Sequence, residues 1–247
     1  MDLSSQCVLL PLEQAQKTYG LFLRNRGIKD QEGLFFYAPP GSAISTPLQL
    51  SSPRLYIFLG EGASLSLYDF SKEDRFLHVD LAASSQFTSV SHSTAGKQTY
   101  TVSLNGEGAS AELRGLLDLS GKEEGHVDVL MEHHAPHCRS RQHFKFVLQD
   151  QSRSSFAGKI YVHQAAQKTE SYQLNQNLLL SDEAFASSKP NLEIFADDVK
   201  ASHGATFSQL NAEELFYFRS RGFSEAEAKE LLRKGFCQEI LNFLPAS

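Results

Sequence analysis

Residues 197–203 carry side chains that are able to do chemistry. Asp197 and Asp198 stand side by side, and a lone imidazole, His203, follows next to a glycine. Adjacent side chains of an extended segment point to opposite faces, so the two aspartates form a poor acid–base pair. Imidazole is a borderline-soft ligand that takes iron and other transition metals. His203 is therefore a candidate metal ligand, and its structural alternative is a hydrogen-bonded turn histidine.

A second run, from Glu132 to Cys138, gathers three imidazoles and one thiol in the order EHHAPHC. Histidine nitrogens and cysteine thiolates are the usual ligands of zinc. On an extended strand, however, His133 and His134 face opposite sides and meet at one ion only if Pro136 bends the chain. The competing interpretation is a structural segment that binds no metal.

The chain has three cysteines, Cys7, Cys138 and Cys237, and they are widely separated. An odd and scattered set predicts no disulfide framework. Three thiols without a CxxC pair also fall short of the four thiolates that hold a conventional protein-bound iron–sulfur cluster. If this protein handles iron and sulfur, it has to share ligands with another chain.

Several familiar sites are missing from the sequence. It contains no phosphate-binding GxxxxGK[ST] loop, no GxSxG nucleophile motif and no HExxH zinc helix. The formal net charge of −6 argues against nucleic acid as the main partner, because phosphate binding needs a basic face. No apolar run approaches the roughly 20 residues that span a bilayer, and the N-terminus does not resemble a secretory signal. We expect a cytoplasmic protein that binds no membrane.

Short β-rich runs separated by turn residues fill the chain between about Gly33 and Thr206. Before them, residues 11–26 carry apolar side chains at helical spacing and predict one short helix closed by Gly27. Residues 181–185 have the composition of a single helical turn. Many close-spaced strands fit a sandwich, a barrel or a β-solenoid, and periodicity alone does not choose among these. The expected strands are Leu34–Tyr37, Leu55–Leu59, Leu65–Asp69, Leu77–Leu81, Thr99–Leu104, Ala111–Leu119, Val127–Met131, Phe144–Leu148, Lys159–Val162 and Leu192–Phe195.

Helical periodicity returns from residue 211 onward. Asn211 with Glu214, and then Ser224 with Glu227, each have the spacing of a capping box, and Gly222 separates the two helices. Two short amphipathic helices cannot form a core alone, so one face should pack on the β-region and another should remain for a partner. The expected apolar face of the second helix is Ala228, Leu231, Leu232, Gly235, Phe236 and Ile240.

The run ADDVKASHGAT, followed by LFYFRSRG, resembles the C-terminal signature of the SufB/SufD family of iron–sulfur cluster assembly proteins, and its wording is closest to the SufD branch. Segments similar to the family extend from about Glu32 to Leu241. The resemblance implies a parallel, right-handed β-helix. It divides the chain into a short N-terminal helical segment (residues 1–32), a β-helix core (33–206) and a C-terminal helical region (207–247). The long N-terminal helical region of SufD looks shortened to the first thirty residues.

The resemblance also implies a function. A SufD-like chain is a non-catalytic scaffold subunit of the SufBCD complex that pairs with SufB through the β-helix, binds the ATPase SufC through the C-terminal helices and forms a homodimer when isolated. His203 would lie at the interface with SufB and support iron entry or nascent cluster formation. Many family members have cysteine where this chain has Ala201, so this chain offers no thiol there. We expect no stable cofactor on the isolated chain and a transient iron–sulfur cluster in the complex.

Two alternatives stay open. One is a metal-dependent enzyme with a β-solenoid or cupin-like core that uses His133, His137 and a further ligand. The other is a SufB-like scaffold, which is disfavoured because the chain lacks the additional cysteines of that subunit.

Overall fold

The computed structural model describes residues 6–30, 32–48, 52–70 and 72–244. The ends of the expected terminal segments, residues 1–5 and 245–247, lie outside the described residues. The helices are α1 (Leu12–Asn25), α2 (Ala212–Ser220) and α3 (Glu225–Leu241). The strands are β1 (Val8–Pro11), β2 (Leu34–Ala38), β3 (Ala43–Leu48), β4 (Arg54–Leu59), β5 (Ser64–Asp69), β6 (Arg75–Leu81), β7 (Gln86–Ser93), β8 (Gly96–Leu104), β9 (Ser110–Leu119), β10 (Glu124–His133), β11 (Arg139–Leu148), β12 (Arg153–Val162), β13 (Thr169–Leu179), β14 (Phe185–Ile194) and β15 (Val199–Gln209).

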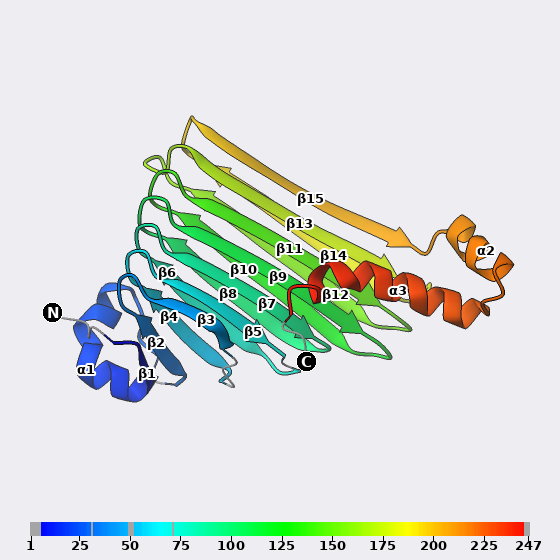
Figure 1. Ribbon diagram of the computed structural model, residues 1–247, viewed down its shortest axis with the longest axis horizontal. Coiled ribbons are helices and arrows are strands. Elements are labelled where there is room, and N and C mark those ends of the chain that lie inside the picture. The colour runs from blue at the N-terminus through cyan, green and yellow to red at the C-terminus, as the bar shows by residue number, and fades with distance from the viewer. Residues whose placement is uncertain (1–5, 31, 49–51, 71, 245–247) are drawn as a thin grey trace.

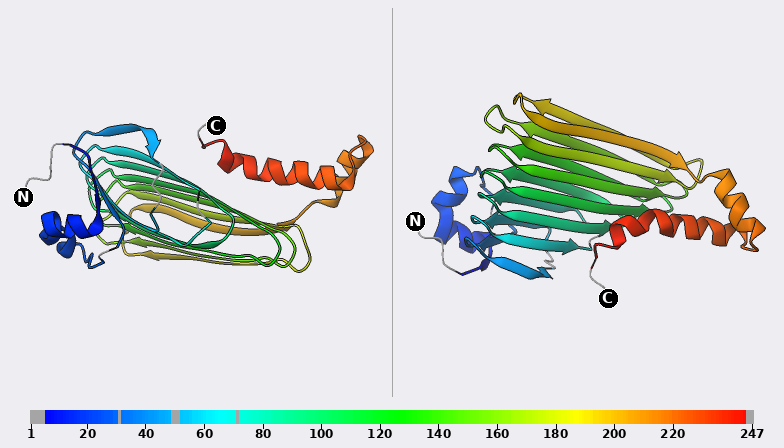
Figure 2. Two further views of the ribbon diagram at one scale, coloured as in Figure 1. Left: turned by 90° about the horizontal axis from the view of Figure 1, so that it is seen from below. Right: turned by 45° about the horizontal axis from the view of Figure 1, so that its top comes forward.

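Successive strands alternate between two sheets. One sheet has the order β1-β2-β4-β6-β8-β10-β12-β14, and the other has the order β15-β13-β11-β9-β7-β5-β3. Every neighbouring pair is parallel except β1 with β2, so the chain winds as a parallel β-helix (Figures 1 and 2). Apolar side chains from both sheets meet between them in one continuous core. The expected fold class is confirmed.

The coils lengthen along the chain. Leu34 pairs with Leu55 near the N-terminus, whereas Arg153 pairs with Phe185 near the other end. No constant repeat length exists, which explains why the sequence shows no strict repeat although the fold is a solenoid.

Five strands, β1, β3, β7, β13 and β15, were absent from the sequence expectation, and the sequences of β7, β13 and β15 are rich in polar residues. In β13, for example, Gln173, Asn175 and Asn177 are buried and face the inside of the β-helix. They are tolerated there because each bonds to a neighbouring coil or strand residue: the Gln173 amide donates to Gln142 at 2.8 Å, and the Asn177 amide donates to the Asn175 oxygen at 2.9 Å. Residues 181–184, where one helical turn was expected, form a non-helical turn into β14.

The N-terminal helix α1 covers the first coils together with β1. Its Leu12, Ala15 and Leu23 are buried against aromatic side chains of β2 and β4, including Phe35 and Phe58. β1 pairs antiparallel with β2 and joins the helix to the sheet. The expected helix is present, and it ends just before Gly27, whose φ of 73° favours glycine.

The two C-terminal helices differ in how they contact the β-helix. α2 lies beyond the end of β15, and α3 runs back along the outer face of β9 and β11 (Figures 1 and 2). Cys237 and Ile240 are buried against Val90, Leu116 and Val147. Of the expected apolar face of α3, Ala228 and Ile240 are buried, whereas Leu231 is 40% exposed.

Capping and ion pairs hold these helices. Ser224 and Glu227 form the expected capping box of α3, whereas the Asn211 side chain accepts from the Glu213 backbone N–H, so α2 has an N-cap without a box. On the buried side of α3, Lys145 Nζ lies 2.6 Å from Glu239 and also donates to the Phe236 carbonyl at 3.0 Å. No helix in the described ranges is both long and apolar enough to span a lipid bilayer.

Candidate functional site

The last coil, formed by β14 and β15, leaves one end of the β-helix open. β15 pairs with β13 so that His203 stands in register with Gln173. Gln173 faces the interior, and residues in register on parallel strands share a face, so His203 lies on the interior-facing side of a coil that no further coil covers. His203 is accordingly exposed.

His203 is a strand residue with an accessible ring. Among the described residues, its imidazole has no hydrogen-bond or ion-pair partner, which differs from the hydrogen-bonded turn histidine considered as its alternative. Neighbouring Gly204 has no positive φ, and a Cβ there would meet only Leu174 Cδ1, at 3.4 Å. The accessible ring and the small neighbour leave both imidazole nitrogens available to an ion or to a second chain.

Buried polar side chains line the interior beneath this coil. Ser171 lies in register with Ala201, and its hydroxyl is 2.6 Å from that of Ser140. The Ser140 hydroxyl in turn lies 2.9 Å from His133 Nε2. β14 and β15 contain one imidazole and no thiol, so the open coil by itself supplies a single soft ligand.

Exposed apolar side chains surround the open coil. Phe207, in register with buried Asn177, is 52% exposed on the same interior-facing side as His203. Ile194, in register with Val162, is 37% exposed on β14. In a longer solenoid, these positions would be covered by the next coil.

The other expected groups of this segment lie apart from His203. Asp197 and Asp198 are exposed in the turn between β14 and β15, not in an extended strand as expected. The Asp198 carbonyl accepts from the Lys168 backbone N–H, and its own N–H donates to Gln167 Oε1 at 3.0 Å. Their roles are those of turn residues, so the conclusion that they are no acid–base pair is unchanged.

An open groove of about 450 Å³ adjoins β15. Its lining includes His203, Arg114, Arg141, His143 and Glu239, so basic groups predominate beside the candidate ligand. Burial lowers the pKa of His143, with the Gln176 side chain and Glu239 opposing that shift, so this imidazole is neutral in the folded protein at neutral pH.

The EHHAPHC run does not form one site. His133 is fully buried, His134 lies partly exposed outside, and His137 is exposed in a turn with a φ of 60°. Thus His133 and His137 do not meet, and the alternative of a metal-dependent enzyme that uses both has no joint site here. Cys138 is fully buried, with its thiol donating to the Gly106 carbonyl at 3.3 Å, and burial raises its pKa.

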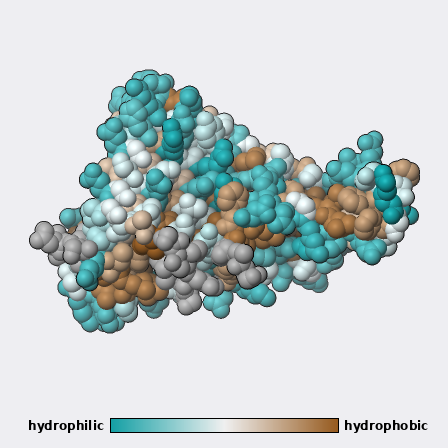
Figure 3. Space-filling view, viewed as in Figure 1, coloured by the Kyte–Doolittle hydropathy of each residue, from teal (hydrophilic) through white to brown (hydrophobic). Residues whose placement is uncertain are grey.

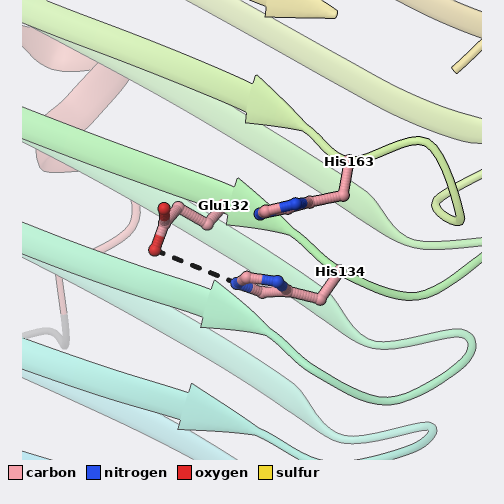
Figure 4. A group of neighbouring side chains, drawn as sticks. All are labelled: Glu132, His134 and His163. Atoms are coloured by element: carbon pink, nitrogen blue, oxygen red, sulfur yellow. Dashed lines mark ion pairs between the residues drawn. The ribbon is translucent and has the colours of Figure 1, made fainter. Parts of the chain in front are cut away.

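Sequence reasoning missed the residue that does approach this run. His163, directly after β12, stacks on His134, and Glu132 lies beside both rings (Figure 4). The register between the two strands would have indicated this contact. β10 pairs with β12 up to His133 and Val162, so the residues that follow, His134 and His163, lie next to each other. Unequal coil lengths hide that register in the sequence.

Burial makes His133 a source of acid sensitivity. Desolvation, and secondarily the charge of His134, lowers the pKa of His133 to about 3. An unfolded histidine titrates near 6.5, so below that pH the unfolded chain binds a proton that the folded chain does not. Stability therefore falls as pH drops from about 6.5 toward about 3, by about 1.4 kcal/mol per pH unit for this residue.

We predict that His133→Gln reduces the slope of the free energy of unfolding against pH by the contribution of about one proton. Urea unfolding between pH 4 and 6.5, with EDTA present, measures the slope. His126→Gln, at a partly exposed position of β10, is the matched control, because it removes a histidine that is not buried. An unchanged slope in His133→Gln would show that the buried imidazole is not the titrating group.

Comparisons with known proteins agree with this architecture. Residues 42–236 match the family model described as "SUF system FeS cluster assembly, SufBD core domain". The chain is 36% identical over 174 residues to the iron–sulfur cluster assembly protein SufD of Escherichia coli, covering 68% of this chain and 41% of the relative. It is 43% identical over 141 residues to a Synechocystis iron–sulfur cluster assembly SufBD family protein, covering 56% of this chain and 31% of the relative.

A chloroplastic relative, protein ABCI7 of Arabidopsis thaliana, is 39% identical over 121 residues, covering 49% of this chain and 25% of that protein. The chain thus spans less than half the length of these curated relatives.

Proposed function

The chain belongs to the SufBD family of the SUF iron–sulfur cluster assembly system, and from this membership we propose that it is a non-catalytic, SufD-like assembly subunit. In this role it pairs with a SufB-type subunit, binds a SufC-type ATPase and takes part in forming a nascent cluster at the shared interface. The cluster is cargo of the complex, and the isolated chain holds none stably. ATP hydrolysis is left to the partner, because this sequence has no phosphate-binding loop.

The open last coil is the observation that carries the proposal. β14 and β15 are long edge strands, of 10 and 11 residues, and each has one edge without a partner strand among the described residues. Such edges can hydrogen-bond to strands of another chain. Exposed Phe207 and Ile194 add apolar surface that a second β-helix would bury. Two isolated copies of this chain could use the same surface to form a homodimer.

His203 lies at this open end, so pairing would bring it against the other subunit. One imidazole cannot hold a cluster, and Ala201 adds no thiol. In a shared site, the SufB-type subunit supplies the remaining ligands that the cluster needs. In the complex, His203 serves as a ligand for incoming iron or for the nascent cluster.

We predict that His203→Ala leaves folding and pairing nearly intact while iron and sulfide per complex fall severalfold. The stability loss should be small, because the exposed ring has no hydrogen-bond or ion-pair partner in the part of the chain that the structure describes. The measurements are the melting temperature and the iron and sulfide content of the anaerobically reconstituted complex. Thr206→Ala, on the opposite face of β15, is the matched control. Normal iron loading in a well-folded His203→Ala complex would show that His203 is not a ligand for iron or for the nascent cluster.

The ATPase contact is assigned to α2. None of its residues is buried, and Phe216 and Tyr217 are 74% and 55% exposed. Figure 3 shows apolar surface along the two C-terminal helices. α3, in contrast, already covers Val90, Leu116 and Val147 of the β-helix. α2 therefore offers exposed aromatic surface, while α3 fixes its position.

A further inference from the structure

Three side chains from two adjoining coils lie together on the outside of the β-helix, not on the interior-facing side that carries His203. Glu132 is near the end of β10, His134 follows β10, and His163 follows β12 (Figure 4). One ligand atom from each lies within 4.8 Å of the other two. Glu132 Oε2 and His134 Nε2 are 3.9 Å apart. Two imidazoles and one carboxylate are a typical three-residue ligand set for a transition metal.

The backbone fixes this arrangement. The His163 N–H donates to the His133 carbonyl at 3.0 Å and so continues the parallel pairing of β10 with β12. The two imidazole rings stack with centroids 4.1 Å apart and planes 25° apart. Neighbouring coils thus hold the backbone positions of the three residues next to one another, while the side chains can still rotate.

A buried nitrogen without a partner provides the second observation. His163 Nε2 is buried and makes no hydrogen bond within the described part of the chain. Leaving a buried polar atom unsatisfied costs about 1–3 kcal/mol, so such atoms usually have a partner. Aromatic ring contact, which also includes the tilted ring of Tyr161 with its centroid 4.5 Å from that of His163, explains the ring positions. It explains neither the unpartnered nitrogen nor the carboxylate beside the two rings.

We propose that Glu132, His134 and His163 bind one divalent first-row transition-metal ion, such as zinc or iron(II). Calcium and magnesium are disfavoured because they select oxygen ligands. The site has no sulfur ligand, since the Cys138 thiol is buried and bonded to the Gly106 carbonyl. The side chains of Glu132 and His134 are 29% and 36% exposed, which leaves room for water or an added ligand to complete the coordination.

Metal binding should draw the three side chains together. Ligand atoms around a tetrahedral zinc ion lie about 3.4 Å apart, so the 3.9 Å pair has to close by about half an ångström. Stacked rings do not direct their nitrogen lone pairs at a common point. Binding is therefore expected to rotate one imidazole out of the stack, which gives a spectroscopic signal besides the metal itself.

The test uses the purified 247-residue chain, stripped with a chelator and titrated with Co²⁺ as a visible probe and then with Zn²⁺ as its competitor. His163→Phe keeps an aromatic ring in the stack and removes the ligand nitrogen. Glu132→Gln removes the carboxylate charge with little change in shape. His137→Asn is the matched control, because His137 is an exposed histidine of the same run, and asparagine tolerates its positive φ.

The expected result is one Co²⁺ per chain, with visible absorption bands, displacement by Zn²⁺ and shifts of two histidine ring signals by NMR. His163→Phe and Glu132→Gln should each weaken binding at least about tenfold while the metal-free melting temperature stays near that of the parent. His137→Asn should bind as the parent does. Absence of stoichiometric binding, equal binding by His163→Phe, or loss of binding in His137→Asn would each overturn the site. These outcomes are independent of partner binding and of cluster assembly at His203.

Discussion

Phe207→Asp is expected to abolish pairing with the SufB-type subunit. Phe207 is 52% exposed on the interior-facing side of the last coil, where a second β-helix would cover it. A carboxylate there would lose aromatic contact and would have to be desolvated on pairing. The combined loss should reach about 3 kcal/mol, a weakening of about a hundredfold or more. Co-purification and light scattering of the mixed subunits measure it.

The chain offers a close control for this variant. Phe70, after β5, is also a surface phenylalanine, at 49% exposure, and lies far from the open coil in the sheet order. Phe70→Asp should pair normally. If Phe207→Asp and a second change, Ile194→Asp, both pair as the parent does, the open end is not the interface.

Phe216→Asp in α2 is expected to eliminate co-purification with the SufC-type ATPase and to leave the melting temperature nearly unchanged. The side chain is 74% exposed, so its replacement removes no internal packing. Leu21→Asp, at a 57% exposed position of α1, is the control and should retain the ATPase. Retained binding in Phe216→Asp and Tyr217→Asp would exclude α2 as the contact.

Point substitutions are preferable here to removal of residues 211–247. Such a deletion would also remove Cys237 and Ile240, which cover Val90, Leu116 and Val147 on the β-helix. The exposed apolar patch would itself promote association, so loss of ATPase binding would have two explanations.

The sequence predicted the fold where side chains follow the ordinary rules for strands. Segments such as β4 and β10 alternate or cluster apolar residues and were identified. β13 was not, since its interior-facing serine, glutamine and asparagines are stable only after neighbouring residues and coils supply hydrogen-bond partners. Choosing a solenoid over a sandwich required the family resemblance, because variable coil lengths remove any fixed period.

The sequence likewise predicted one of the two candidate sites and missed the other. His203 was identified from its motif. Its position is accessible because β15 is the last strand of the β-helix. The cluster of Glu132, His134 and His163 depends on the pairing of β10 with β12, which local sequence does not encode. The face of α3 was identified in part: Ala228 and Ile240 are buried as expected, but the sequence expectation left out Cys237, which packs as an apolar residue and whose pKa burial raises to about 11.

Shared assembly of the cluster is tested most directly by co-expressing this chain with SufB-type and SufC-type proteins from the same genome. Anaerobic purification, followed by mass determination and iron and sulfide analysis, gives both the composition and the cargo of the complex. We predict a stable complex that contains all three proteins and gains a cluster, whereas this chain alone gains none. Elution of the chain apart from both partners, or a stoichiometric cluster on the chain alone, would contradict the proposed function.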